Sequence, residues 1–141
     1  MVYLLTMKAC FKNINEFTTP EQIEAVKEFT RFLHSNLPLN QDVYITFVPE
    51  RSEQMTTGVR KAKSQIFVLS GQRLLIDILR TLSHEWVHEF QHQKMGLKDT
   101  DKIQDIGGPE ENMANVLSGI FLKKFNKEYP QYTNVIFGEQ N

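Results

Sequence analysis

The chain has very little cysteine: of its 141 residues only Cys10 is one, which excludes an internal disulfide. A chain so poor in cysteine is typical of a reducing compartment. No stretch of about 18 uninterrupted apolar residues occurs, so we expect no membrane span. Residues 1–8 are too short for the apolar region of a secretory signal and lack a basic segment before it. These absences favour a cytoplasmic protein, which would be in the host cytoplasm if a virus encodes it.

Strong charge of either sign is also absent, since the formal net charge is −1. No general attraction to nucleic acid is therefore expected. The local basic cluster Arg60, Lys61 and Lys63 is interpreted as a solvated hairpin and not as a phosphate site. There is no repeat or low-complexity tract, and the length and 40% apolar content fit one domain over residues 1–141. The oligomeric state cannot be inferred from these features.

The most informative segment of the chain is residues 84–88, which reads His-Glu-x-x-His. On a helix, residues i and i+4 lie about 40° apart in direction and about 6 Å apart along the axis. The imidazoles of His84 and His88 can therefore converge on one metal ion. Glu85 lies on the flank, where its carboxylate can reach a metal-bound water without binding the metal. The pattern predicts a zinc site with Glu85 as the catalytic base.

This motif needs a helix, and the residues between Arg73 and Met95 include neither proline nor glycine. Gly96 stands where a left-handed residue would end such a helix. Apolar residues recur through the segment at helical spacing, namely Leu75, Ile78, Leu79, Leu82, Trp86 and Phe90. We therefore expect one helix to carry both histidines.

A zinc site of this kind needs a third protein ligand. His92 continues the histidine series, but it would lie about 12 Å from His84 along a straight helix, too far to share one ion. The other candidates are Glu110 and Glu111, in the first turn of a helix that Pro109 is suited to begin. Acidic residues are favoured in a first turn whatever their function, so a capping role is the alternative for both.

The helix face on which each glutamate lies separates the two candidates. Ala114, Asn115 and Ser118 project within about 60° of Glu111, given 100° per residue. Such small residues would let this helix approach the histidine helix closely enough for a short carboxylate to reach the metal. Glu110 points about 100° away. Glu111 is therefore the predicted third ligand.

Together these motifs resemble the gluzincin group of zinc metallopeptidases: the residues concerned are His84, Glu85 and His88, then Pro109, Glu111, Ala114 and Asn115. In size and layout the chain is similar to the minigluzincins. Its Glu-x-x-Ala-Asn half also resembles ImmA/IrrE-like peptidases and small phage-encoded proteins with the same histidine motif. The resemblance covers about residues 65–125.

The resemblance implies that His84, His88 and Glu111 bind Zn²⁺ and that Glu85 is the general base and acid. It also implies that Asn115 supports a ligand histidine, at a position where gluzincins often have aspartate. A neutral amide orients an imidazole less strongly than a carboxylate does, so this departure would weaken the support.

Local patterns along the rest of the chain predict an α+β fold. A helix should begin after Thr19 as N-cap and run to about Asn36. Other segments are predicted as follows: 43–48, 54–60 and 65–70 as strands, 1–17 as a first strand or covering arm, and 129–141 as a tail that is extended over 129–137. The tail is expected to pack on the core, with a latent form that blocks the cleft as the alternative. A backing helix, a small mixed sheet, the histidine helix and the glutamate helix would make a minimal zincin-like domain.

The predicted activity is zinc-dependent hydrolysis of a peptide bond in a peptide or protein substrate by metal-activated water. Glu85 would take the proton of the water and return it to the leaving amine. The substrate could pair with an exposed strand, either 54–60 or 65–70. No motif identifies the group that assists the oxyanion, for which the candidates are His92, Tyr129 and Tyr132, with packing or surface roles as the alternative. A catalytically inactive zinc-binding interaction or structural protein of the same fold is the alternative function.

Overall fold

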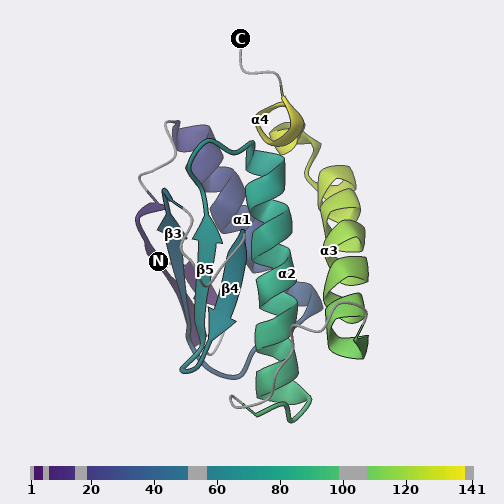
Figure 1. The fold of residues 1–141 in the computed structure, drawn as a ribbon. Helices are drawn as coiled ribbons and strands as arrows, with labels where there is room; N and C mark the ends of the chain where they lie inside the picture. Colours follow the sequence, from purple (N-terminus) through teal and green to yellow (C-terminus); the bar gives the residue numbers. More distant parts are fainter. Residues whose placement is uncertain (1, 5–6, 15–18, 51–56, 99–107, 139–141) are drawn as a thin grey trace.

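The computed structural model describes residues 2–4, 7–14, 19–50, 57–98 and 108–138 (Figure 1). Its strands are β1 (Val2–Leu4), β2 (Met7–Lys12), β3 (Val43–Val48), β4 (Gly58–Lys61) and β5 (Gln65–Leu69). Its helices are α1 (Pro20–Asn36), α2 (Leu75–Lys94), α3 (Pro109–Glu128), the 3₁₀ turn η2 (Pro130–Tyr132) and α4 (Thr133–Phe137). The predicted α+β class is confirmed.

The strands form one mixed sheet in the order β1-β2-β3-β5-β4. The three inner strands are parallel, and an antiparallel strand lies at each edge. The predicted strands 43–48 and 65–70 are confirmed. In the predicted strand 54–60, residues 58–60 belong to β4, and residues 54–56 lie outside the described part. Residues 1–17 hold two paired strands, and not the single strand or arm that was predicted.

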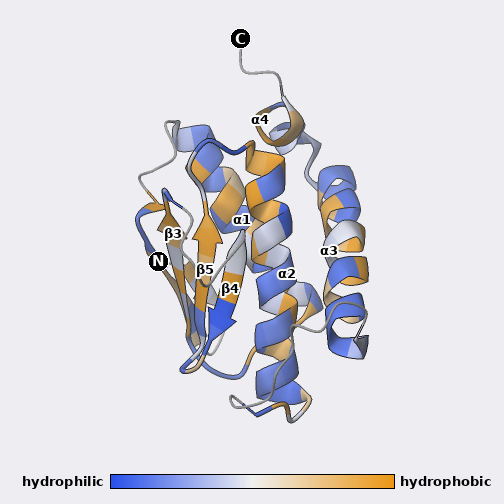
Figure 2. Ribbon diagram, in the orientation of Figure 1, coloured by the Kyte–Doolittle hydropathy of each residue, from blue (hydrophilic) through white to orange (hydrophobic). Residues whose placement is uncertain are grey.

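One face of the sheet is covered by α1 and α2, and α3 packs on the side of α2 that faces away from the sheet (Figure 1). The strand alternation sets this arrangement, because Val43, Ile45 and Phe47 are buried whereas Tyr44 is exposed. The buried apolar residues of the sheet and the helices form one core cluster, and β5 is largely hydrophobic along its length (Figure 2). Trp86 of α2 is completely buried in this core.

Local signals set the helix ends close to where the sequence predicts them. The Thr19 hydroxyl accepts a hydrogen bond from the Gln22 backbone N–H (3.2 Å), and α1 ends at Asn36. Gly96 has a φ of 81°, so a left-handed residue does follow α2. Pro109 is the first residue of α3.

The extended conformation predicted for residues 129–137 is wrong, because this segment forms η2 and α4. The prediction that it packs on the core is confirmed, since Ile136 is buried there. Tyr129, where this segment begins, follows the C-terminal end of α3, whereas Glu111 is in its first turn. At 1.5 Å per residue the two lie about 27 Å apart. The described part of the tail therefore lies far from the predicted site.

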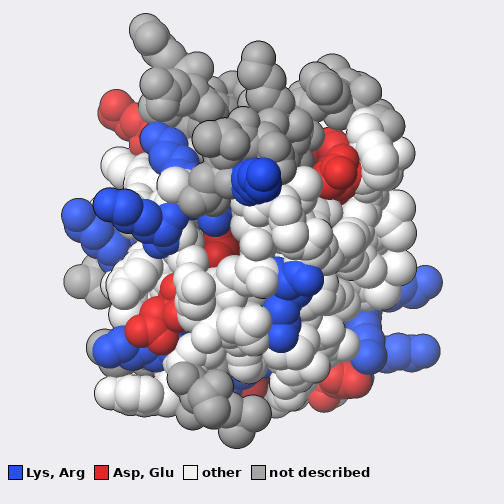
Figure 3. Space-filling view, turned by 90° about the horizontal axis from the view of Figure 1, so that it is seen from below, with Lys and Arg blue, Asp and Glu red and all other residues white. Residues whose placement is uncertain are grey.

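Within the described residues, no helix combines the length and the apolar character needed to cross a bilayer. Seen from the end of the molecule where α3 begins, acidic and basic side chains are interspersed among the residues shown in colour (Figure 3).

Candidate metal centre

Three polar side chains from α2 and α3 converge on one point. The Nε2 atoms of His84 and His88 lie 3.2 Å apart. The Glu111 Oε1 lies 3.1 Å from the Nε2 of His88 and 2.5 Å from the Nε2 of His84. The structure thus brings together the three predicted ligands, and in the described part of the chain they form a group that could hold a metal ion.

The spacing of these three atoms fits a tetrahedral metal site. With metal–ligand distances of about 2.0–2.2 Å, tetrahedrally arranged ligand atoms lie about 3.3 Å apart. Two of the three measured distances are close to that value. The shortest, between Glu111 and His84, would need to widen by less than about 1 Å to reach that value. Two imidazole nitrogens and one carboxylate oxygen suit several divalent transition metals, so the donor set supports a metal without fixing its identity.

Close packing of α3 on α2 makes the convergence possible. Ala114 and Ser118, one and two turns after Glu111, are buried, as their small side chains predict. Asn115 on the neighbouring position remains exposed, yet its side chain makes a hydrogen bond with His84. Asn115 is therefore placed where it can support a ligand histidine, as the motif implies.

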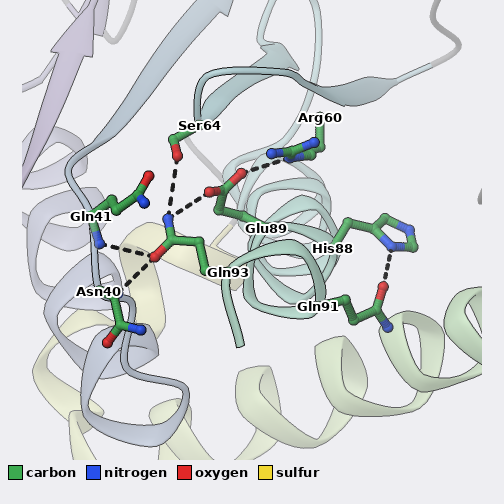
Figure 4. A network of polar contacts seen from close by, with 8 residues as sticks. All are labelled: Asn40, Gln41, Arg60, Ser64, His88, Glu89, Gln91 and Gln93. Atoms are coloured by element: carbon green, nitrogen blue, oxygen red, sulfur yellow. Dashed lines mark hydrogen bonds and ion pairs between the residues drawn. The ribbon is translucent and has the colours of Figure 1, made fainter. Parts of the chain in front are cut away.

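A residue that the sequence analysis missed, Gln91, supports the other histidine. Its Oε1 lies 2.9 Å from the Nδ1 of His88 (Figure 4). Its Nε2 donates to the backbone carbonyl of Glu110 (3.0 Å). The one available signal was its place three residues after His88, a spacing that puts both side chains on one face of a helix.

Burial alters the acid–base properties of the site. Burial is the main cause that lowers the pKa of His84, an effect that the Glu111 carboxylate opposes. A lowered pKa favours the neutral imidazole that a metal requires. Burial, together with the negative charge of Glu111, raises the pKa of Glu85 to about 8, and a hydrogen bond from the backbone N–H of Arg60 opposes the rise. A bound cation would also oppose it.

The edge strand β4 lies directly against the part of α2 that carries Thr81 and Glu85. A Cβ added at Gly58 would come within 2.4 Å of the Thr81 Cγ2 and 3.3 Å of the Glu85 Cγ. Glycine is thus what allows the strand to lie so close to the helix. Of the two strands predicted to pair with a substrate, β4 is at the edge, whereas β5 pairs on both sides with β3 and β4. Segment 65–70 is therefore wrong as a substrate edge.

Arg60 is not part of a solvated hairpin, so that prediction is wrong for this residue. Its Nε lies 2.6 Å from the Glu89 Oε1, and both side chains are buried. Gln93 donates to the other oxygen of Glu89 (Figure 4). Lys61 is exposed, with its Nζ 5.2 Å from the centre of the Phe67 ring. The arginine alone is buried because its side chain faces α2 and finds a carboxylate there.

Neither tyrosine proposed for the oxyanion lies near the cluster. Tyr129 and Tyr132 stack on Phe125 at ring-centre distances of 4.7 and 6.1 Å, beyond the end of α3 that is remote from Glu111. Their packing roles are confirmed. His92 lies one helical turn beyond His88 and is not a member of the three-residue group, as its distance along the helix predicts.

No protein-family model, curated protein or solved structure matches this chain.

Proposed function

We propose that the protein is a zinc metallopeptidase that hydrolyses peptide bonds in a peptide or protein substrate. The observation that carries the proposal is the convergence of His84, His88 and Glu111 beside the buried carboxyl group of Glu85. The resemblance to gluzincins points in the same direction. A zinc ion held by these ligands would supply a Lewis acid that polarises a carbonyl and acidifies water.

Glu85 is the residue that moves protons in this proposal. Its carboxylate takes a proton from the attacking water and later gives it to the leaving amine. The hydrogen bond from the Arg60 backbone holds this carboxyl group in place. A pKa raised well above that of an ordinary glutamate suits a group that must both accept and donate a proton near neutral pH.

The substrate binds in an extended conformation along β4. The backbone N–H of Leu69 donates to the carbonyl of Thr57, so odd-numbered residues of this strand region bond to β5. The backbone groups of Gly58 and Arg60 therefore lie on the outer side of the sheet. The N–H of Arg60 is engaged by Glu85, so a peptide would pair with the backbone of Gly58. An extended peptide can add to such an edge by main-chain hydrogen bonds, and this edge passes Glu85.

Zinc binding is tested with a matched pair of variants, Glu111→Ala and Glu110→Ala. Both remove a glutamate from the first turn of α3, but only Glu111 reaches the histidines. We expect Glu111→Ala to weaken zinc binding by more than about 100-fold, since even outer-sphere partners contribute about 10–100-fold. Glu110→Ala should bind zinc as the wild type does. Unchanged zinc stoichiometry and affinity in Glu111→Ala would exclude it as a ligand.

Turnover is tested by incubating the zinc-loaded protein with a panel of denatured caseins, with and without a chelator. We expect cleavage that the chelator abolishes, and no cleavage by Glu85→Gln although this variant keeps its zinc. Cleavage by purified Glu85→Gln would contradict the role assigned to this base.

The alternative is a zinc-binding protein of the same fold that does not cleave and acts in an interaction or a structure. It is favoured by the position of Tyr129 and Tyr132, which are too remote to assist an oxyanion. Consistent absence of cleavage by the zinc-loaded wild type would support this alternative.

A further inference from the structure

Gln91 is an uncharged polar residue of α2 that lies fully inside the protein. Its side chain is completely buried, although an amide carries strong donors and an acceptor. A buried amide without partners would destabilise the fold, and here both ends are paired. Its oxygen lies against the Nδ1 of His88, and its nitrogen donates to the carbonyl of Glu110. This one side chain therefore connects the second histidine with the beginning of α3.

The orientation of the Gln91 amide follows from its two partners. A backbone carbonyl can only accept, so the amide nitrogen must face Glu110 and the amide oxygen must face His88. That oxygen can accept only from an N–H at Nδ1. A neutral His88 then carries its proton on Nδ1 and directs the lone pair of Nε2 toward His84 and Glu111.

The second bond of Gln91 acts on the residue next to Glu111. Glu110 and Glu111 are in the first turn of α3, so fixing the Glu110 peptide restrains the Cα from which the Glu111 side chain leaves. A displacement of about 1 Å is enough to impair a site of this type. Gln91 thus restrains both a histidine on one helix and a carboxylate on another.

We propose that Gln91 is a positioning residue that arranges His88 and Glu111 for the metal before it binds. The proposal rests on the metal centre proposed above. Without Gln91, a neutral His88 can place its proton on Nε2 and its ring can rotate, and both changes must be reversed before binding. The metal affinity would then fall even though all three ligands remain.

The test compares Gln91→Met with Gln93→Met, a control on the same helix. Gln93 is also buried in part and hydrogen-bonded, but to Glu89, Ser64 and the backbone of residues 40 and 41 (Figure 4). Methionine keeps the length and volume in both cases while removing the amide. Zinc affinity is measured by competition with a chromophoric chelator, and the visible spectrum of the Co²⁺ form reports the ligand geometry.

We expect Gln91→Met to bind zinc about 10–100-fold more weakly than the wild type and to change the Co²⁺ spectrum. Gln93→Met should lose thermal stability but keep its zinc affinity within about threefold. The reason is that the hydrogen-bond partners of Gln93 do not include the metal ligands. If Gln91→Met fails to fold, Gln91→Asn takes its place, because a side chain shorter by one methylene cannot span both partners. Wild-type affinity in the folded Gln91 variant would overturn the proposal. A wild-type protein that binds no zinc would instead contradict the metal centre itself.

Discussion

Replacing Glu85 by glutamine should stabilise the metal-free protein, and by an amount that depends on pH. Burial raises the pKa of Glu85 from an ordinary 4.5 to about 8. Each pKa unit corresponds to about 1.36 kcal/mol, so above pH 8 the ionised carboxylate costs the fold about 4–5 kcal/mol relative to the unfolded chain. Glutamine has nearly the same shape, carries no charge and can still accept the hydrogen bond from the Arg60 backbone.

The direction of the pH dependence follows from proton binding. Between pH 4.5 and 8 the folded protein holds on Glu85 a proton that the unfolded chain has released. The free energy of unfolding of the wild type therefore falls as the pH rises through this range. Glu85→Gln lacks this dependence, so the two proteins should be equally stable near pH 4 and should differ most above pH 8.

Urea unfolding of chelator-treated protein at pH 5, 7 and 9 measures this difference. Glu128→Gln, an exposed glutamate at the end of α3, is the control and should follow the wild type at every pH. Adding zinc should narrow the gap, because a cation beside Glu85 favours its ionised form. A Glu85→Gln variant that is less stable than the wild type at pH 9, or equally changed at every pH, would refute the reasoning.

Three further variants test the packing around the site. Arg60→Met leaves the buried Glu89 carboxylate without its charged partner and should lower the free energy of unfolding in urea by about 3–5 kcal/mol. The double variant Arg60→Met with Glu89→Leu should recover much of that stability. Gly58→Ala places a methyl group 2.4 Å from the Thr81 Cγ2 and 3.0 Å from the Phe67 carbonyl oxygen, and should cost about 1–3 kcal/mol. Adding Thr81→Ser removes the closer of these contacts and should restore part of the loss. Truncation after Glu128 should lower the melting temperature without raising activity, because α4 packs on the core and does not cover the site; a folded, more active truncated protein would contradict this.

Elements with a strong local signal were predictable from the sequence. The cap at Thr19, the apolar spacing that ends before Gly96 and the alternation of residues 43–48 each depend on neighbours along the chain. The two histidines also belong to this class, because a single helix fixes their relative position. Glu111 could be chosen because helix periodicity places small residues beside it.

Features that depend on which segments meet in space were not predictable. Nothing local distinguishes the edge strand β4 from the inner strand β5, since the difference arises only when β5 pairs with β3. The sequence suggests that Arg60 is solvated, because only the folded structure places Glu89 opposite it. An apolar tail suggests an extended segment, whereas in the structure Tyr129 and Tyr132 stack on Phe125 and a helical turn brings them there.

The polar residues of α2 form two rows that serve different parts of the site. His84 and His88, with Gln91, face α3, and their partners are Glu111 and the Glu110 carbonyl. A second row, at spacings of four residues, consists of Glu85, Glu89 and Gln93, and the first two of these contact β4 through Arg60.

A spacing of four residues brings the two histidines to one point. The same spacing gives α2 a second polar row, which faces the edge strand β4. The first row contacts α3 and forms the candidate metal centre with it. The second row contacts β4 and holds this candidate substrate edge on α2. Because Glu85 begins the second row and adjoins the first, its carboxyl group lies where the two meet. A change in the Arg60–Glu89 pair should accordingly alter the Michaelis constant for peptide substrates more than the affinity for zinc, whereas a change in Gln91 should do the reverse.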